Sequence, residues 1–289
     1  MIYKKEIDEE IKSVESLKIL TEVYGEIASI RMIKIRNFVL KNREFLQTIN
    51  EIFQDSLKAY ASKLTELVRR GKLKKGGRVT FLAHNGKTVA VLISANTGFY
   101  GEVIQATFEK FLDDVRQGNV EATIIGRMGR SLFLESEPKT PYTYFDFPDY
   151  GIDHVKLSEA IRHLVSYEEI RVYFGRYQSI IKQTPSKFSI SAGTPISKEV
   201  EEPKVKYIFE PSVEKILMFF ETEIFASLFD QSIRESQLAK FASRILAMNV
   251  ASENIRTRLD SLSLEKLKLF HRLVERKQLN SLSSIMFSK

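Results

Sequence analysis

The stretch Ala239–Ile255, AKFASRILAMNVASENI, contains neither glycine nor proline and is helical in composition. Arg244, Asn249, Glu253 and Asn254 are mixed with alanine and larger apolar residues. A surface helix of a globular domain usually has one polar face and one apolar face. A buried helix holds fewer polar groups than this one. The stretch therefore raises the question of what such a helix contacts.

Glycine and proline are distributed very unevenly along the 289 residues. All seven prolines lie between Pro138 and Pro211, and Gly25 is the only glycine before Gly71. Because these two residues are the strongest helix breakers, their absence predicts one long helix over about residues 5–70 and another from residue 212 onward. Apolar residues recur at helical spacing in both, as in Ile11, Val14, Leu17 and Leu20.

Two long helices at opposite ends, with a domain between them, predict an antiparallel coiled coil. The predicted division is residues 1–75 for the N-terminal coiled-coil helix, 76–205 for a central α/β domain and 206–289 for the C-terminal coiled-coil helix. A set of shorter helices packed on the domain remains an alternative.

The middle of the chain alternates between strand and helix patterns. RVTFLAH (78–84) and KTVAVLIS (87–94) predict two strands joined as a hairpin through Asn85-Gly86. Residues 101–118 and 154–167 predict helices, 120–126 predicts a buried strand, and 169–190 predicts a strand pair that turns near Thr184-Pro185. The expected fold class is α/β: a Rossmann-like central domain with a partly parallel sheet, flanked by the two long helices.

Two glycine-containing stretches in the central domain are candidates for chemistry. SANTGFYGE (94–102) lacks the third glycine of a dinucleotide fingerprint and the Gly-Lys-Ser/Thr of a P-loop. Gly98 and Gly101 are therefore expected to be residues of a tight strand-to-helix turn. GRMGRSLF (126–133) is expected to form a strand-to-strand corner with exposed arginines, while an anion site remains an alternative.

Composition narrows the function classes. The chain has no cysteine, so disulfides and cysteine–zinc sites are excluded, and its four histidines show no metal-ligand spacing. No catalytic triad order is recognisable, and we expect neither a catalytic site nor a cofactor or metal. We also expect no signal peptide and no membrane span, since no segment approaches about 20 apolar residues.

The formal charge of +7 favours acidic partners in general. The densest basic run, RRGKLKKGGR (69–78), contains no aromatic residue, unlike the usual nucleic-acid site. It is expected to be a solvated helix end, so we expect no nucleic-acid partner.

Several motifs, in order along the chain, resemble the gamma subunit of rotary F-type ATP synthases and ATPases. ISANTGFYG (93–101), IGRMGRSLF (125–133), YFGRYQSIIKQTP (173–185) and YIFEPSVEKIL (207–217) are similar to family segments. ESQLAKFASRILAMNVASEN (235–254) is the fullest match. It keeps the family residues Glu235, Ser236, Arg244, Ala247, Met248, Ala251 and Asn254.

The resemblance answers the opening question. It implies a central shaft whose two helices turn inside a ring of alpha- and beta-type catalytic subunits, with an epsilon-type subunit and a membrane c-ring as further expected partners. It places the protein on the cytoplasmic side of a membrane, in a membrane-associated or specialised motor complex. Ring or helix-pair contacts are expected at Arg244, Met248, Asn254, Glu235, Ser236 and Lys18.

The chain also departs from the family pattern. Asn96 stands in an acidic place, and Lys240 stands where the family has glutamate. Leu267, Phe270, His271 and Glu275 occupy the run that touches beta-subunit loops in the family. A specialised ATP-hydrolysing motor not coupled to protons is therefore an open alternative within the family. Outside it, a coiled-coil nucleic-acid-binding or scaffold protein and a small-molecule enzyme are the competing classes.

Overall fold

The computed structural model describes residues 2–69, 78–79, 85–118, 120–191, 194–195 and 213–287. Two very long helices dominate it: α1 (Ile2–Arg69) and α5 (Val213–Phe287). Their lengths of 68 and 75 residues confirm the helices predicted from the missing glycine and proline. No helix in the described ranges is long and apolar enough to cross a membrane. The basic run 69–78 lies largely outside the described residues, as does most of the stretch 191–212.

The chain separates into two compact units, and both long helices pass from one unit to the other. We call Met1–Ser29 with Arg244–Lys289 the helical unit, and Ile30–Ser243 the α/β unit. Within the helical unit the two helices run antiparallel, because Glu10 pairs with Arg258 while Asp8 pairs with Lys266. The three-part division by sequence remains a prediction.

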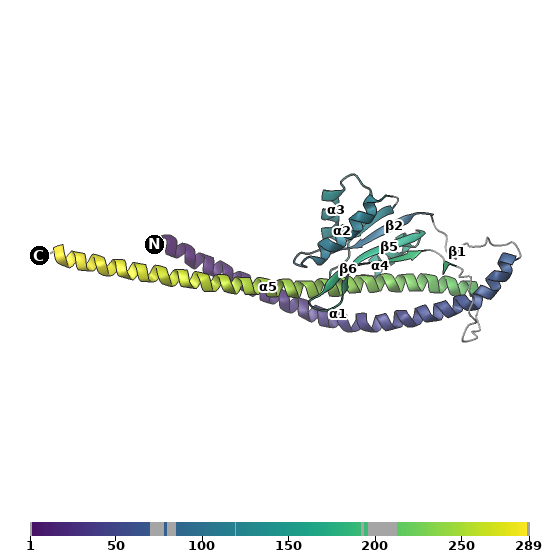
Figure 1. The fold of residues 1–289 in the computed structure, drawn as a ribbon, viewed down its shortest axis with the longest axis horizontal. Coiled ribbons are helices and arrows are strands. Elements are labelled where there is room, and N and C mark those ends of the chain that lie inside the picture. Colours follow the sequence, from purple (N-terminus) through teal and green to yellow (C-terminus); the bar gives the residue numbers. More distant parts are fainter. Residues whose placement is uncertain are drawn as a thin grey trace. The chain divides into compact units, whose positions relative to one another are not determined.

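A five-stranded sheet in the order β4-β3-β2-β5-β6 forms the centre of the α/β unit (Figure 1). Its strands are β2 (Thr88–Ile93), β3 (Val120–Ile125), β4 (Tyr142–Phe145), β5 (Glu169–Tyr177) and β6 (Gln183–Ser191). The first four are parallel, and only β6 runs antiparallel to its neighbour β5. This confirms the predicted partly parallel sheet.

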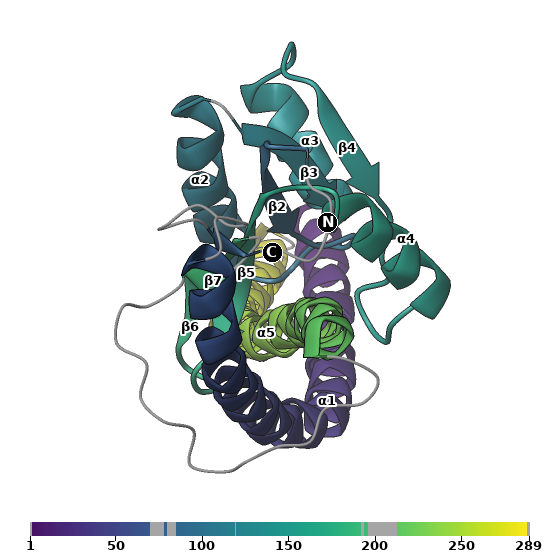
Figure 2. The same cartoon turned by 90° about the vertical axis from the view of Figure 1, so that its right-hand side faces the viewer.

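Helices cover both faces of the sheet (Figure 2). On one face, α2 (Val103–Arg116) and α3 (Arg127–Ser136) bury a core around Phe108, Phe111 and Phe133. On the other, α4 (His154–Leu164) and the first part of α5 bury Leu157, Phe229 and Ile233 with the sheet. The long helix α5 is thus a structural layer of the α/β domain as well as half of a helix pair.

The predicted hairpin at Asn85-Gly86 is wrong. β1 (Arg78–Val79) pairs with β7 (Thr194–Pro195), whereas β2 lies between β3 and β5. The Asn85 side chain instead accepts a bond from the amide of Lys87, and the amide of Asn85 donates to Ser166 in the loop before β5. Both edges of β2 therefore take parallel neighbours, as its largely apolar sequence allows.

Two further predictions need correction. The turn of the strand pair lies at residues 178–182, and Pro185 is inside β6, opposite Gly175. A proline is tolerated there because β6 is an edge strand. The stretch 126–133 is the start of α3 and not a strand-to-strand corner. Gly126 has φ 98°, and a Cβ on it would lie 2.8 Å from the nitrogen of Ala95, so the chain passes close to the loop after β2 before it enters the helix.

Candidate functional site

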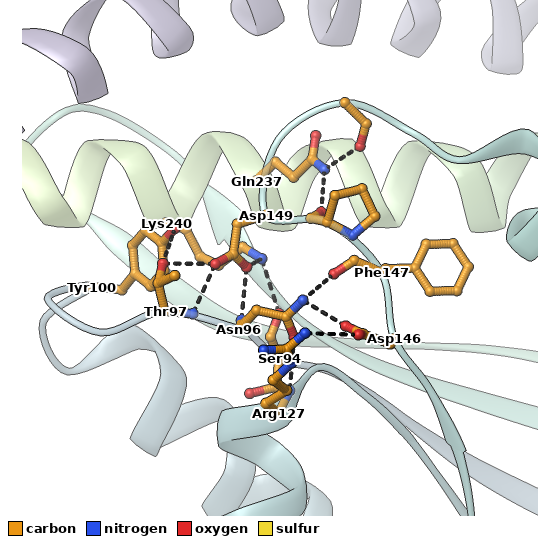
Figure 3. Close-up of polar contacts among 12 residues, drawn as sticks. Ser94, Asn96, Thr97, Tyr100, Arg127, Asp146, Phe147, Asp149, Gln237 and Lys240 are labelled. Atoms are coloured by element: carbon orange, nitrogen blue, oxygen red, sulfur yellow. Dashed lines mark hydrogen bonds and ion pairs between the residues drawn. The ribbon is translucent and has the colours of Figure 1, made fainter.

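One face of α5 meets the loops that follow the parallel strands of the sheet (Figure 3). Lys240 donates to the carbonyl of Ser94, just after β2, over 2.9 Å. Gln237 donates to the carbonyls of Pro148 and Gly151, after β4, and Ser243 donates to that of Tyr100. We call this surface the α5–sheet interface.

The interface lies where open α/β sheets usually bind ligands. The strand order reverses at β2, since β3 and β4 lie on one side of it and β5 and β6 on the other. Ligands of such folds bind outside the carboxyl ends of the strands at this reversal. Here Lys240 and Ser243 reach the loop after β2. Helix α5 of the same chain therefore fills the position at which ligands bind in such folds.

The centre of the interface is a buried ion pair. The Nζ of Lys240 lies 3.2 Å from Oδ1 of Asp149, and the two side chains are only 5% and 9% exposed. The Asp149 carboxylate also accepts from the amides of Asn96 and Thr97, each over 2.9 Å, and from the Thr97 hydroxyl over 2.7 Å. Burial raises the pKa of this carboxyl, but Lys240 and the hydrogen bonds outweigh burial and lower the pKa below its usual value.

Asn96 connects three loops of the interface. Its amide nitrogen donates to Asp146 and to the carbonyl of Phe147, each over 2.7 Å. Its amide oxygen accepts from the backbone N–H of Arg127 at the start of α3. An aspartate at this position could still accept from the Arg127 amide. Its other carboxylate oxygen, however, would lie against the Asp146 carboxylate and the Phe147 carbonyl, which are both acceptors. The asparagine in the family's acidic place thus fits the groups that surround it.

The two departures at Asn96 and Lys240 meet at one residue. The Asn96 backbone and the Lys240 ammonium both bind the Asp149 carboxylate. The sequence alone gave no reason to single out Asp149, Asp146 or Arg127. Arg127 had one signal, its position just after the predicted strand 120–126, whereas Asp146 and Asp149 follow β4, a strand that the sequence analysis did not predict.

The two predicted turn glycines differ in the structure. Gly101 has φ 59°, and a Cβ on it would lie 2.5 Å from the Oγ of Ser243 in α5. A Cβ on Gly98 would meet no heavy atom within 4 Å, and the positive φ values of this loop are those of Phe99 and Gly101, not of Gly98. Only Gly101 is therefore required by its backbone and by the close approach of α5.

Glu235 and Ser236 lie in the α/β unit, buried on α5. The Glu235 carboxylate accepts two bonds from the Arg43 guanidinium on α1, at 2.6 and 2.8 Å, and a third from Gln231. Gln231 in turn accepts from Asn42. This polar cluster fixes α1 against α5, and the hydrogen bond with Glu235 contributes most to the raised pKa of Arg43.

The other four predicted contact residues lie in the helical unit. Arg244 is buried, with its guanidinium carbon 5.8 Å from the centre of the Tyr24 ring. Met248 is buried, and its Cβ lies 3.6 Å from the position of a Cβ on Gly25. Asn254 and Lys18 are exposed. The structure thus places Arg244 and Met248 in the helix pair and leaves Asn254 and Lys18 on its outside.

The outer faces of the helical unit are unusually apolar. The two helices expose many large hydrophobic side chains: Leu17, Ile19, Leu20, Val23, Ile27, Leu246, Val250, Leu264, Leu267 and Phe270. Exposed apolar stretches of this extent mark surfaces that other proteins cover. In the described ranges no group of three His, Cys, Asp or Glu residues could hold a metal ion.

Comparison of the sequence with known proteins identifies the same family that the motifs resemble. The family model described as ATP synthase matches residues 3–269. The ATP synthase gamma chain of Desulfitobacterium hafniense is 22% identical over 275 residues, which is 92% of both chains. That of Clostridium botulinum is 25% identical over 269 residues, 90% of this chain and 89% of the relative.

Two solved structures share the fold. The Tetrahymena thermophila mitochondrial ATP synthase, in a structure of its central stalk and c-ring, contains a chain that matches with a TM-score of 0.57 and 15% identity, over 81% of this chain and 99% of that one. A chain of the Euglena gracilis mitochondrial ATP synthase matches with a TM-score of 0.54 and 16% identity, over 88% and 93%.

Proposed function

This chain belongs to the ATP synthase family, and from that membership we infer that it is a gamma-type subunit, the central shaft of a rotary ATPase. The shaft turns inside a ring of alpha- and beta-type subunits and couples ATP hydrolysis or synthesis to rotation. The chemistry of ATP belongs to the ring, and this chain transmits the steps.

The observation that carries this function is the exposed apolar surface of the helical unit. A free pair of helices needs one apolar stripe, where the two helices meet. Here the outer faces carry further leucine, isoleucine and phenylalanine side chains, such as Ile19, Val250 and Phe270. A shaft enclosed by a ring is surrounded by protein on every side, which accounts for apolar residues that the helix pair leaves exposed.

The finer assignments follow as proposals. Asn254 and Lys18 are outward contacts with the ring, while Arg244 and Met248 hold the helix pair, and Glu235 and Ser236 hold α5 in the α/β unit. We also propose an epsilon-type subunit and a membrane c-ring as partners of the α/β domain, with the complex on the cytoplasmic side of the membrane. The three-part division at residues 75 and 205 corresponds in this proposal to shaft, domain and shaft.

A specialised ATP-hydrolysing motor is the second candidate. Leu267 and Phe270 are exposed at positions of the family run that touches beta-subunit loops, and both are apolar where that run is largely polar. The contacts with the ring therefore differ from those of the family pattern, which favours a motor with changed coupling.

Affinity purification of the tagged full-length chain from its native cells separates these possibilities. We expect alpha- and beta-type subunits in several copies per chain, with ATP hydrolysis in the eluate. Membrane c-type subunits in the same eluate favour a synthase, and other stably attached proteins favour the specialised motor. Recovery of nucleic acid without any ATPase subunit, released steeply by salt, contradicts the shaft function.

A further inference from the structure

Helix α5 is enclosed on every side where it crosses the α/β unit. Residues 235–243 are all buried, and an α-helix completes one turn in about 3.6 residues, so this segment is covered around its whole circumference. On one side Glu235 binds Arg43 of α1, and on another side Lys240 binds Asp149 in the loop after β4. The α/β unit thus surrounds this part of α5.

Three polar side chains on one face of this segment bind the loops of the sheet. Gln237, Lys240 and Ser243 follow one another at a spacing of three residues, which places them along one face of the helix. Figure 3 shows Gln237 and Lys240 reaching from α5 to the loops. Gln237 donates to a carbonyl after β4 over 2.7 Å, while Lys240 and Ser243 donate to carbonyls after β2 over 2.9 and 2.6 Å. Because hydrogen bonds require a particular distance and angle, this row fixes the rotation of α5 about its own axis.

The apolar contacts of this segment fix that rotation less firmly. Burial of Leu238 and Phe241 stabilises the interface, but the hydrophobic effect has no preferred direction. Where α5 passes β5, a Cβ on Gly175 would lie 3.4 Å from the Cβ of Ala239, so helix and strand meet through small groups. Groups this small give little steric resistance to a turning helix. The directional polar bonds therefore supply most of the resistance to rotation.

The ion pair of Lys240 and Asp149 is the polar contact that costs most to break. Both side chains are buried, and the amides of Asn96 and Thr97 hold the Asp149 carboxylate in place. If α5 turned in either direction, the ammonium would leave both the carboxylate and the carbonyl of Ser94. Two opposite charges would then be separated inside the protein, which is strongly unfavourable. The pair therefore opposes rotation of α5 in both directions.

We propose that Lys240, together with Gln237 and Ser243, locks α5 to the sheet and transmits torque between the shaft and the α/β domain. This proposal rests on the shaft function, because only a rotating shaft places torque on this interface. Helix α5 is a single helix over Val213–Phe287, so torque that acts on its part in the helical unit reaches residues 237–243 along the helix. The three side chains are positioning residues, since the chemistry of ATP belongs to the ring.

An engineered disulfide across the same interface makes the lock reversible. The chain has no cysteine, and a Cβ on Gly101 would lie 3.8 Å from the Cβ of Ser243, which is close to the mean separation in disulfides. Gly101→Cys with Ser243→Cys therefore gives a covalent lock that oxidation closes and reduction opens. Each variant is compared with itself in the two redox states, so the strain of a side chain at Gly101 does not affect the comparison.

The measurement uses the assembled complex with its ring fixed to a surface and a magnetic bead on the α/β domain. The bead is attached through an azide-bearing residue in place of Val155, which is 70% exposed on α4, and so does not react with the cysteines. An opposing magnetic torque is applied while ATP is hydrolysed, at a temperature well below the unfolding of every variant, and backward slips of the bead are counted.

In Lys240→Met we expect the rate of ATP hydrolysis to be unchanged and slips to be about 100-fold more frequent, the change that corresponds to the loss of a buried ion pair. When this variant also carries the cysteine pair, oxidation should return the slips to the frequency of the unsubstituted chain. Leu112→Ala is the matched control, because Leu112 is buried in the core on the other face of the sheet. It should destabilise the domain to a comparable extent without adding slips.

The possible failures are distinguishable. If Lys240→Met slips no more often than the unsubstituted chain, if its slips persist after oxidation, or if Leu112→Ala slips equally often, the lock proposal is wrong. If ATP does not rotate the bead on the unsubstituted complex even without an opposing torque, the shaft function itself is wrong.

Discussion

Replacing Lys240 with methionine tests the buried ion pair of the α5–sheet interface. Methionine keeps most of the side-chain volume but removes the ammonium, which leaves the Asp149 carboxylate buried without its cation. Breaking a buried pair in this way costs about 3–5 kcal/mol. Asp149 retains three donors from Asn96 and Thr97, so we expect the lower end, about 3 kcal/mol.

Thermal unfolding followed by circular dichroism measures this loss. For a unit of this size, about 3 kcal/mol corresponds to a fall in Tm of roughly 6–12 °C. The double substitution Lys240→Met with Asp149→Asn removes both charges and should recover part of the loss, with a coupling of about 1–3 kcal/mol. Arg162→Met, at an exposed position on α4, is the control and should change stability by less than about 0.5 kcal/mol.

The pH dependence of the free energy of unfolding gives an independent check on whether Lys240 lowers the pKa of Asp149. In the unsubstituted chain the pKa of Asp149 is lowered in the folded state. Its contribution to stability is therefore present above the unfolded pKa and is lost as the pH falls through the folded pKa. In Lys240→Met burial is no longer opposed by the ammonium, so this pKa rises. The deficit of the variant should then be largest at neutral pH and should shrink toward about pH 4. A deficit that is independent of pH, or a double variant as unstable as Lys240→Met, would refute the reasoning.

Three further predictions concern neighbouring residues. Gly101→Ala should destabilise by about 1–3 kcal/mol, because of its positive φ and the close approach of Ser243, whereas Gly98→Ala should be tolerated; equal denaturant midpoints for the two variants would contradict this. Asn96→Asp should lower the midpoint, because it sets a carboxylate against Asp146, and Asp146→Asn should restore it; a neutral Asn96→Asp variant would show that the amide donor is unimportant. Glu235→Gln should cost about 1.5–3 kcal/mol, since Arg43 loses its charged acceptor, and a stability that matches the unsubstituted chain in urea unfolding would count against the cluster.

The long helices were predictable because helix length depends on local signals. A run without glycine or proline, with apolar residues at helical spacing, has few alternatives to a helix. The same holds for α2, α4 and β3, each bounded by clear changes in pattern. These elements depend on residues that are close together in the sequence.

The predictions were wrong where the local structure depends on contacts with segments that are distant in the sequence. Asn85-Gly86 predicts a hairpin locally, but Ser166 and the parallel neighbours of β2 determine what the turn joins. Gly126 predicts a turn of some kind, but only its close approach to Ala95 shows that a helix follows. Strand order and close backbone contacts are not encoded in short windows of sequence.

The α5–sheet interface was only half predictable. The resemblance drew attention to Lys240 and Asn96 as departures, one at a time. The partner Asp149 lies 91 residues from Lys240 in the sequence, and nothing in its local sequence distinguishes it from other loop aspartates. Only the fold brings the three together and shows that Asp149 interacts with both positions.

Rotation of the α/β domain is the most direct test of the central claim. A probe attached through Val155→Cys, the only cysteine of the variant, reports the motion of this domain in a complex whose ring is fixed to a surface. If this chain is the shaft, added ATP drives continuous rotation of the probe in one direction, and the rotation stops when ATP is removed. A complex that hydrolyses ATP while the probe stays still would show that this chain is not the shaft.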